Sequence, residues 1–172
     1  MASTYTLISS QVLASSAASV TFSSIPATYT DLVLRMSARS STSATVDGID
    51  WYINTTSINA SSYTTLQGNG ASVTSVRSGG FSNAAQNSID AATSTANTFG
   101  SVEIYLPNYA GTTTKPSSSF AAAENNTTTA YIVAQAYFYN NTTAVSSLIF
   151  YPSTYTNFVT GSSFYLYGIK NS

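Results

Sequence analysis

The sequence predicts an all-β fold, an antiparallel two-sheet sandwich of the jelly-roll kind. Aromatic and β-branched residues are frequent, with 13 Tyr and 8 Phe, whereas charged residues make up only 6% of the chain, so strong helix formers are scarce. Apolar and polar residues alternate in several short segments, which Ser, Thr, Asn and Gly separate at close spacing. This pattern is typical of an antiparallel sandwich or barrel, and we favour a jelly-roll-like sandwich.

The first half of the chain contains five expected strands. The clearest covers residues 31–39, where every second residue is apolar, and this alternation places Arg35 and Arg39 together on the opposite face. Residues 79–98 are rich in Ala, Asn and Ser with weak periodicity, so a loop or a short helix fits there. The other four expected strands are residues 5–13, 20–22, 49–53 and 63–67.

The second half gives a stronger strand pattern, interrupted by an expected polar loop at 112–117. Residues 148–151 are Leu, Ile, Phe and Tyr without alternation, which predicts a strand covered on both faces. In total we expect eight to ten strands in a single domain spanning residues 1–172. The strands expected in this half are residues 101–106, 120–124, 131–139, 145–151 and 164–169.

One internal similarity links two proline-containing segments. Residues 26–32 (PATYTDL) resemble residues 152–158 (PSTYTNF), and each begins with Pro and has Asp or Asn at the sixth position. Proline fixes φ, and Asp or Asn side chains bond to nearby backbone amides, so both segments could form the same corner turn between sheets. A chain biased towards Ser, Thr and Tyr also produces such matches by chance, and the sequence leaves both interpretations open.

The charges argue against nucleic-acid and membrane partners. The five cations, Arg35, Arg39, Arg77, Lys115 and Lys170, are scattered, whereas a phosphate-binding surface needs several on one face. No window approaches the length of an apolar membrane span, and residues 1–22 are not expected to be a signal peptide. A formal net charge of −1 on a nearly uncharged surface gives little repulsion between copies, which favours a subunit that packs against neighbours.

Catalytic chemistry has few candidate residues. The chain has no His and no Cys, so an activated serine would need Lys115 or Lys170, and we expect neither to be buried. Glycoside hydrolysis would need a close carboxylate pair, for which Glu103 and Glu124 are the candidates; we favour solvated or Arg-paired surface acids instead. We therefore expect no enzymatic activity and no catalytic residues.

Metal and ligand signals are weak. Asp47, Gly48 and Asp50 faintly resemble a calcium loop, but the further acids of such a loop are missing, so we predict an ordinary β-turn, no metal site and no cofactor. The tyrosines fit three uses, namely sugar stacking, subunit contacts and core packing, of which core or interface is the default. Those on expected strands are Tyr105, Tyr131, Tyr137, Tyr139, Tyr165 and Tyr167.

Three segments resemble a known group of proteins. They are TFSSIPATYTDLVL (residues 21–34), ANTFGSVEIYLPNY (96–109) and GSSFYLYGI (161–169). Together they resemble small virion structural proteins of tailed phages, especially of phages that infect aquatic bacteria. The resemblance implies a jelly-roll-like sandwich that acts as a capsid decoration (cement) protein or as a small part of a tail or fibre assembly. Residues 79–96 resemble nothing in that group, so their role stays open.

The resemblance implies a binding function rather than a catalytic one. We expect the protein to bind the major capsid protein on the outer surface of the capsid and to stabilise the shell, as a homo-oligomer and most naturally a trimer at three-fold positions. The alternative is a tail- or fibre-associated adsorption module that binds host surface glycans. Since Arg and Tyr are enriched at interfaces, the interface candidates are Arg35, Arg39, Tyr29 and Tyr155.

Overall fold

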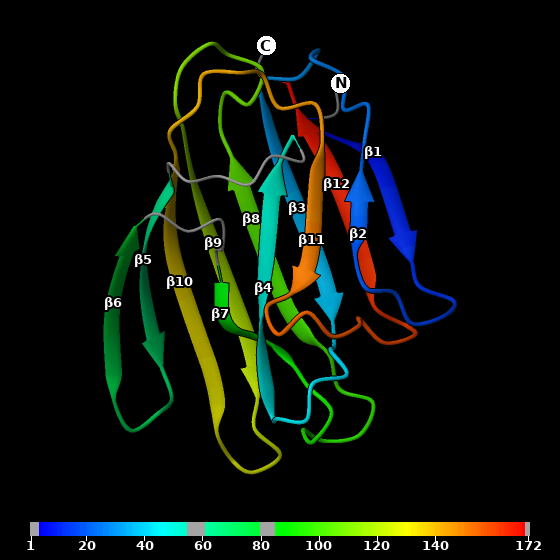
Figure 1. Cartoon of the computed structure of the whole chain (residues 1–172), viewed down its shortest axis with the longest axis vertical. Coiled ribbons are helices and arrows are strands. Elements are labelled where there is room, and N and C mark those ends of the chain that lie inside the picture. Colours follow the sequence, from blue (N-terminus) through cyan, green and yellow to red (C-terminus); the bar gives the residue numbers. More distant parts are fainter. Residues whose placement is uncertain (1–3, 55–60, 80–84, 171–172) are drawn as a thin grey trace.

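The computed structural model describes residues 4–54, 61–79 and 85–170, and within these ranges twelve strands form two antiparallel sheets (Figure 1). In the same residues, no helix long and apolar enough to cross a membrane is present. The large sheet has the strand order β1 (Tyr5–Val12), β12 (Ser163–Ile169), β3 (Asp31–Ala38), β8 (Gly100–Leu106), β9 (Lys115–Glu124), β10 (Ala130–Tyr139), β5 (Ser61–Gly68), β6 (Val73–Gly79). The small sheet has the order β2 (Val20–Phe22), β11 (Leu148–Pro152), β4 (Val46–Ile53), β7 (Ala85–Asp90).

The strand order is that of a jelly roll with two inserted hairpins. The chain alternates between the sheets, with β1, β3, β8 and β12 in the large sheet and β2, β4, β7 and β11 in the small one. These eight strands form two four-stranded sheets, β1-β12-β3-β8 and β2-β11-β4-β7, which is the jelly-roll arrangement. The pairs β5–β6 and β9–β10 extend the large sheet beyond β8. The predicted sandwich is confirmed, and the insertions make one sheet twice as wide as the other.

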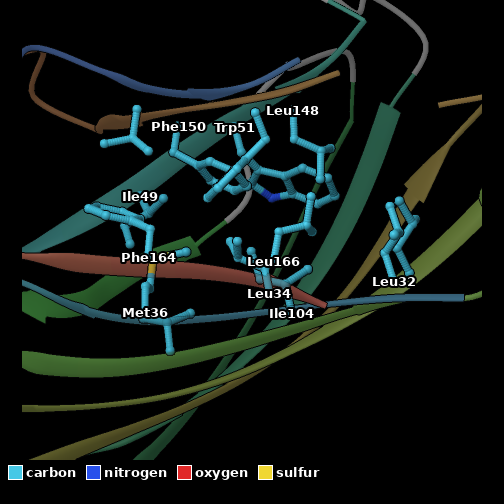
Figure 2. Close-up of a cluster of buried hydrophobic side chains, with 14 of the residues drawn as sticks. Leu32, Leu34, Met36, Ile49, Trp51, Ile104, Leu148, Phe150, Phe164 and Leu166 are labelled. Carbon is cyan, nitrogen blue, oxygen red and sulfur yellow. The ribbon is translucent and has the colours of Figure 1, made fainter. Parts of the chain in front are cut away.

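Aromatic and aliphatic side chains from both sheets meet in one core (Figure 2). Trp51 of β4 is 2% exposed, stacks on Phe150 of β11 at a centroid distance of 6.3 Å, and reaches Tyr137 of β10 at 4.9 Å. From the large sheet, alternate residues such as Leu34 and Ile104 point towards this cluster. Trp51 therefore packs against a neighbour in its own sheet and also links the small sheet to the inserted hairpin β9–β10 of the large sheet.

The structure contains more strands than the sequence predicts. The expected loop or short helix at 79–98 is wrong for residues 85–90, because Ala85–Asp90 forms β7 at the edge of the small sheet, whereas residues 91–98 form a loop as expected. Strand β6 is missing from the expected set because Val73–Gly79 has only two large apolar residues and every one of its residues is exposed or half-buried. Both strands are largely polar, so they form because they pair with β4 and β5 and not because of an apolar pattern of their own.

Two further expectations about the second half are wrong. The polar loop expected at 112–117 ends early, because Lys115 already begins β9 and faces Tyr139 in β10. Strand β11 is not covered on both faces: Leu148 and Phe150 are buried, whereas Ile149 is only half-buried. An unbroken apolar run therefore does not require two covered faces here, since aromatic and aliphatic residues also occupy the outer face of the small sheet.

The two proline segments occupy equivalent positions in the fold but differ in conformation. Each connects a strand of the small sheet to a strand of the large one, β2 to β3 and β11 to β12. In the second, Tyr155 has a φ of 55° and its amide donates to the carbonyl of Pro152 at 2.8 Å. In the first, the Tyr29 amide donates to Tyr109 Oη at 3.4 Å. Of the two open interpretations, the structure favours corners between the sheets, but the two corners are not the same turn, because different contacts hold each one.

The half-buried Tyr29 ring covers a glycine of β12. A Cβ added to Gly168 would overlap Tyr29 Cγ. We expect Gly168→Ala to lower the free energy of unfolding by about 1–3 kcal/mol, because the ring has to shift off the sheet. Thermal unfolding measures this, with Gly79→Ala as the control, since a Cβ there meets no atom within 4 Å. Equal melting temperatures for the two variants would contradict this packing role of Tyr29.

Candidate docking face

The outer face of the large sheet, which points away from the small sheet, exposes apolar side chains on neighbouring strands. Phe120 of β9 is 55% exposed and Ile132 of β10 is 50% exposed. Phe120 lies opposite Ala134 of β10, which in turn lies opposite Leu66 of β5, so the apolar row crosses three strands. We define the docking face as the outward side chains of Leu66, Val73, Tyr105, Phe120, Ile132 and Phe138. Exposed apolar residues that are neighbours across several strands are a candidate interaction surface.

Strand alternation creates this face. On β10, Val133 and Tyr137 are buried towards the interior, which leaves Ile132 and Phe138 on the outside. Both sets are apolar, so β10 is apolar on its inner and outer sides. Because the small sheet covers only the inner side of β10, the apolar side chains on its outer side are exposed to solvent.

A shallow depression of about 390 Å³ lies in the docking face. It is lined by small residues, including Ser118, Ala134 and Ala136, and by the larger Leu66 and Phe120. A hollow floored by small side chains between larger apolar ones can receive a protruding side chain from a partner. The docking face is therefore both apolar and hollowed.

An ion pair borders the docking face. Arg35 Nε donates to Glu103 Oε2 at 2.8 Å, and the Arg35 guanidinium lies 5.9 Å from the centroid of the Tyr5 ring. The hydrogen bond and the charge of Glu103 raise the pKa of Arg35. Glu103 lies opposite Phe120 in the sheet, so the pair adjoins the apolar row. Because both side chains are about half exposed, the pair contributes little to stability and stays available to a partner.

The prediction that Arg39 shares an exposed face with Arg35 is wrong. Arg39 follows the last residue of β3 and is 8% exposed. Its guanidinium donates to four backbone carbonyls of residues 92–98 at 2.7–3.3 Å. The strand ends before Arg39, so the alternation that placed it beside Arg35 no longer applies. Arg39 holds the segment after β7 and is not available as an interface residue.

The structure does not bring Glu103 and Glu124 together as a carboxylate pair. Glu103 lies opposite Phe120 of β9. Glu124 ends β9 four residues after Phe120, so the two acids are separated by about 13 Å along the strand direction. Glu124 accepts bonds from the amides of Thr95 and Asn126, each at 2.6 Å. Desolvation opposes ionisation of Glu124, but these bonds and those from neighbouring hydroxyls outweigh it and lower its pKa. Glu103 of β8 is thus paired with Arg35, whereas Glu124 of β9 holds two neighbouring loops through hydrogen bonds.

The expectation that Lys115 is exposed is wrong. Lys115 is 1% exposed, and burial lowers its pKa. Its ammonium donates to the carbonyls of Gly111 at 2.9 Å and Thr113 at 2.6 Å. These bonds direct the charge at the backbone of the preceding loop rather than at a serine hydroxyl. Lys115 therefore fixes the start of β9.

The predicted β-turn at Asp47 and Asp50 is wrong, because both residues lie within β4. Asp47 Oδ2 accepts bonds from Thr42 Oγ1 at 2.6 Å and Thr154 Oγ1 at 2.9 Å. Asp50 Oδ1 accepts a bond from Ser153 Oγ at 2.7 Å. Across residues 4–54, 61–79 and 85–170, no group of three or more acidic side chains gathers.

The remaining interface candidates lie apart from the docking face. Tyr155 is 64% exposed on the small-sheet side of the sandwich, and Tyr29 is half-buried against Gly168. Of the tyrosines on strands, Tyr137 and Tyr139 are in the core, whereas others lie on the outer face of the large sheet. The tyrosines are therefore divided between the core and the outer faces of the two sheets.

Comparison with protein-family models, curated protein sequences and solved structures finds no match to this chain. The fold and the geometry of its faces therefore carry the functional proposals.

Proposed function

We propose that this chain is a structural protein of a tailed-phage virion, a capsid decoration protein that binds the major capsid protein on the outer surface of the shell. The observation that carries the proposal is the apolar docking face on the widened half of the large sheet. The resemblance of residues 21–34, 96–109 and 161–169 to phage virion proteins supports the same role.

The weakly charged, partly apolar surface suits a protein that binds a repeating shell. Many subunits on a repeating lattice need only modest contacts each, because each subunit that prefers the assembled shell stabilises it by mass action. A face of apolar side chains with the Arg35–Glu103 pair at its border gives such contacts without a dense charge pattern. The low overall charge of −1 keeps long-range repulsion between neighbouring copies small.

Edge strand β6 supports self-association, with a trimer as the proposed state. Its outer side has no partner strand in the part of the chain that the structure describes. Natural edge strands are usually protected by proline, clustered charge or brevity, but Val73–Gly79 has seven residues, no proline and only Arg77 as a charge. Contacts between copies at this edge would continue the docking face from one subunit to the next.

Particle stability tests the proposal. Removing the protein from purified particles is expected to lower the temperature at which the shell ruptures, and adding it back should restore that temperature. An unchanged rupture temperature in both steps would contradict a decoration role. Copy number separates the alternative: many copies over the head fit decoration, whereas a few copies at the tail fit an adsorption module that binds host surface glycans.

A further inference from the structure

Three tyrosines gather on the outer face of the small sheet, on the side of the sandwich opposite the docking face. Tyr52 of β4 and Tyr151 of β11 meet edge to face at a centroid distance of 5.5 Å. The Tyr155 ring lies 6.3 Å from that of Tyr151, and its hydroxyl lies 3.3 Å from the Tyr52 hydroxyl. We call Tyr52, Tyr151 and Tyr155 the tyrosine cluster. It combines flat apolar rings with polar tips on an otherwise weakly charged surface.

A buried carboxylate adjoins the cluster. Asp50 lies opposite Tyr151 in the sheet and is 2% exposed. Ser153 satisfies Oδ1, but Oδ2 is fully covered and has no hydrogen-bond partner. Desolvation raises the pKa of Asp50; the bond from Ser153 lowers it, the charge of Asp47 raises it, and the Tyr155 side chain lowers it. Burial makes the charge of this carboxylate costly, and from the cluster the side chain that favours the charged form through a hydrogen bond is that of Tyr155.

The backbone of Tyr155 adds a second unusual feature. Its φ of 55° is in the left-handed region, which a bulky side chain rarely occupies. Among the described non-glycine residues with positive φ, four are asparagines, which tolerate this region, and the others are Ser24 and Tyr155. Tyr155 is nevertheless 64% exposed, so core packing does not explain why a large ring is held there. Strained residues of this kind are concentrated at ligand sites.

We propose that the tyrosine cluster and Asp50 form a binding site for a neutral saccharide. The rings pack against the apolar C–H face of a sugar, and the tyrosine hydroxyls bond to its hydroxyl groups. The Tyr155 side chain, which is exposed and acts on the Asp50 carboxylate, moves aside so that a sugar hydroxyl donates a charge-assisted hydrogen bond to Asp50. The negative charge of Asp50 disfavours acidic sugars, which is why the ligand is neutral.

This site is independent of the proposed capsid role. The docking face and the tyrosine cluster lie on opposite faces of the sandwich, so a subunit bound through the first leaves the second exposed. Failure of saccharide binding would leave the docking face untouched, and failure of particle binding would leave the saccharide site untouched.

Affinity electrophoresis of the full chain tests the site, in native gels that contain dextran, laminarin or galactomannan. We expect retardation in at least one gel, weakened at least about tenfold by Tyr155→Ala and by Asp50→Asn. Tyr5→Ala is the matched control, because Tyr5 is 48% exposed on the opposite side of the molecule, and its retardation should equal that of the wild type.

Several outcomes overturn the proposal. These are no retardation by any of the three polysaccharides, retardation that Tyr155→Ala and Asp50→Asn leave unchanged, and equal loss in Tyr5→Ala. Protection of residues 151–156 from hydrogen exchange on assembled particles also overturns it, because a protein would then cover the cluster.

The stability of Asp50→Asn separates binding from folding. The raised pKa means that the folded state prefers the protonated acid, so the wild type loses stability as pH rises above the ordinary value of 3.8 through the folded pKa. Asparagine removes that loss, so at pH 7 we expect the variant to melt at a higher temperature than the wild type, with the gain vanishing at acid pH. A variant that is more stable yet fails to bind supports a ligand role; a variant that melts lower at pH 7 contradicts it.

Discussion

Replacing Phe120 and Ile132 together with aspartate is expected to abolish binding to the particle. Both side chains are at least half exposed in the free protein, so the melting temperature should stay close to that of the wild type. In the bound state two carboxylates would be buried without partners, and the affinity should fall more than about 100-fold. Co-sedimentation of the variant with stripped particles measures the loss, and thermal unfolding shows that the fold is intact.

A matched pair of substitutions controls for charge alone. Leu7→Asp with Val12→Asp adds the same two charges on β1, at the other edge of the large sheet, where the side chains are 51% and 63% exposed. This variant should bind particles as the wild type does. Equal loss from both double variants would show that added negative charge, rather than the docking face, weakens binding.

Arg39→Ala is expected to destabilise the fold more than Gly168→Ala does. It removes the donor to four buried or partly buried carbonyls of residues 92–98, of which that of Thr95 also accepts from the amide and hydroxyl of Thr98. We expect a loss of about 3 kcal/mol or more in the free energy of unfolding, which is a fall in melting temperature of about 6–12 °C for a chain of this size. Thermal unfolding of the purified variant measures this fall.

Arg39→Lys separates the charge of Arg39 from its hydrogen-bond geometry. It keeps the charge but loses the planar fork that reaches several carbonyls at once, so it should recover only part of the stability. An Arg39→Ala variant that melts with the wild type would show that the segment 92–98 is held by other contacts. Arg35→Ala should change the melting temperature little, because the Arg35–Glu103 pair is exposed.

Local alternation predicts strands well where one face is buried. The segment around Leu34 is recognisable because alternate apolar residues, Leu32, Leu34, Met36 and Ala38, point to one core. The sequence does not identify β7, or the Val73–Gly79 strand, because their residues are polar and their strand character comes from hydrogen bonding to neighbours. The jelly-roll order depends on how the chain alternates between the two sheets. That alternation is visible only once the pairing of the strands is known.

The candidate site is less predictable than the fold. Leu66, Phe120 and Ile132 are far apart in the sequence, and only the register of three strands makes them neighbours. Because β10 is apolar on both faces, its sequence does not say which face the small sheet covers. Arg39 illustrates the opposite problem, since extending an alternation by one residue past the strand end places a buried arginine on the surface.

Hydrogen exchange of the free and particle-bound protein tests the central claim most directly. The docking face predicts slower exchange on the particle in β5, β6, β9 and β10, the strands that widen the large sheet. Exchange in β2, β4 and β11, on the other side of the sandwich, should not change. Protection confined to the small sheet, with β5, β6, β9 and β10 exchanging as in the free protein, would contradict the account.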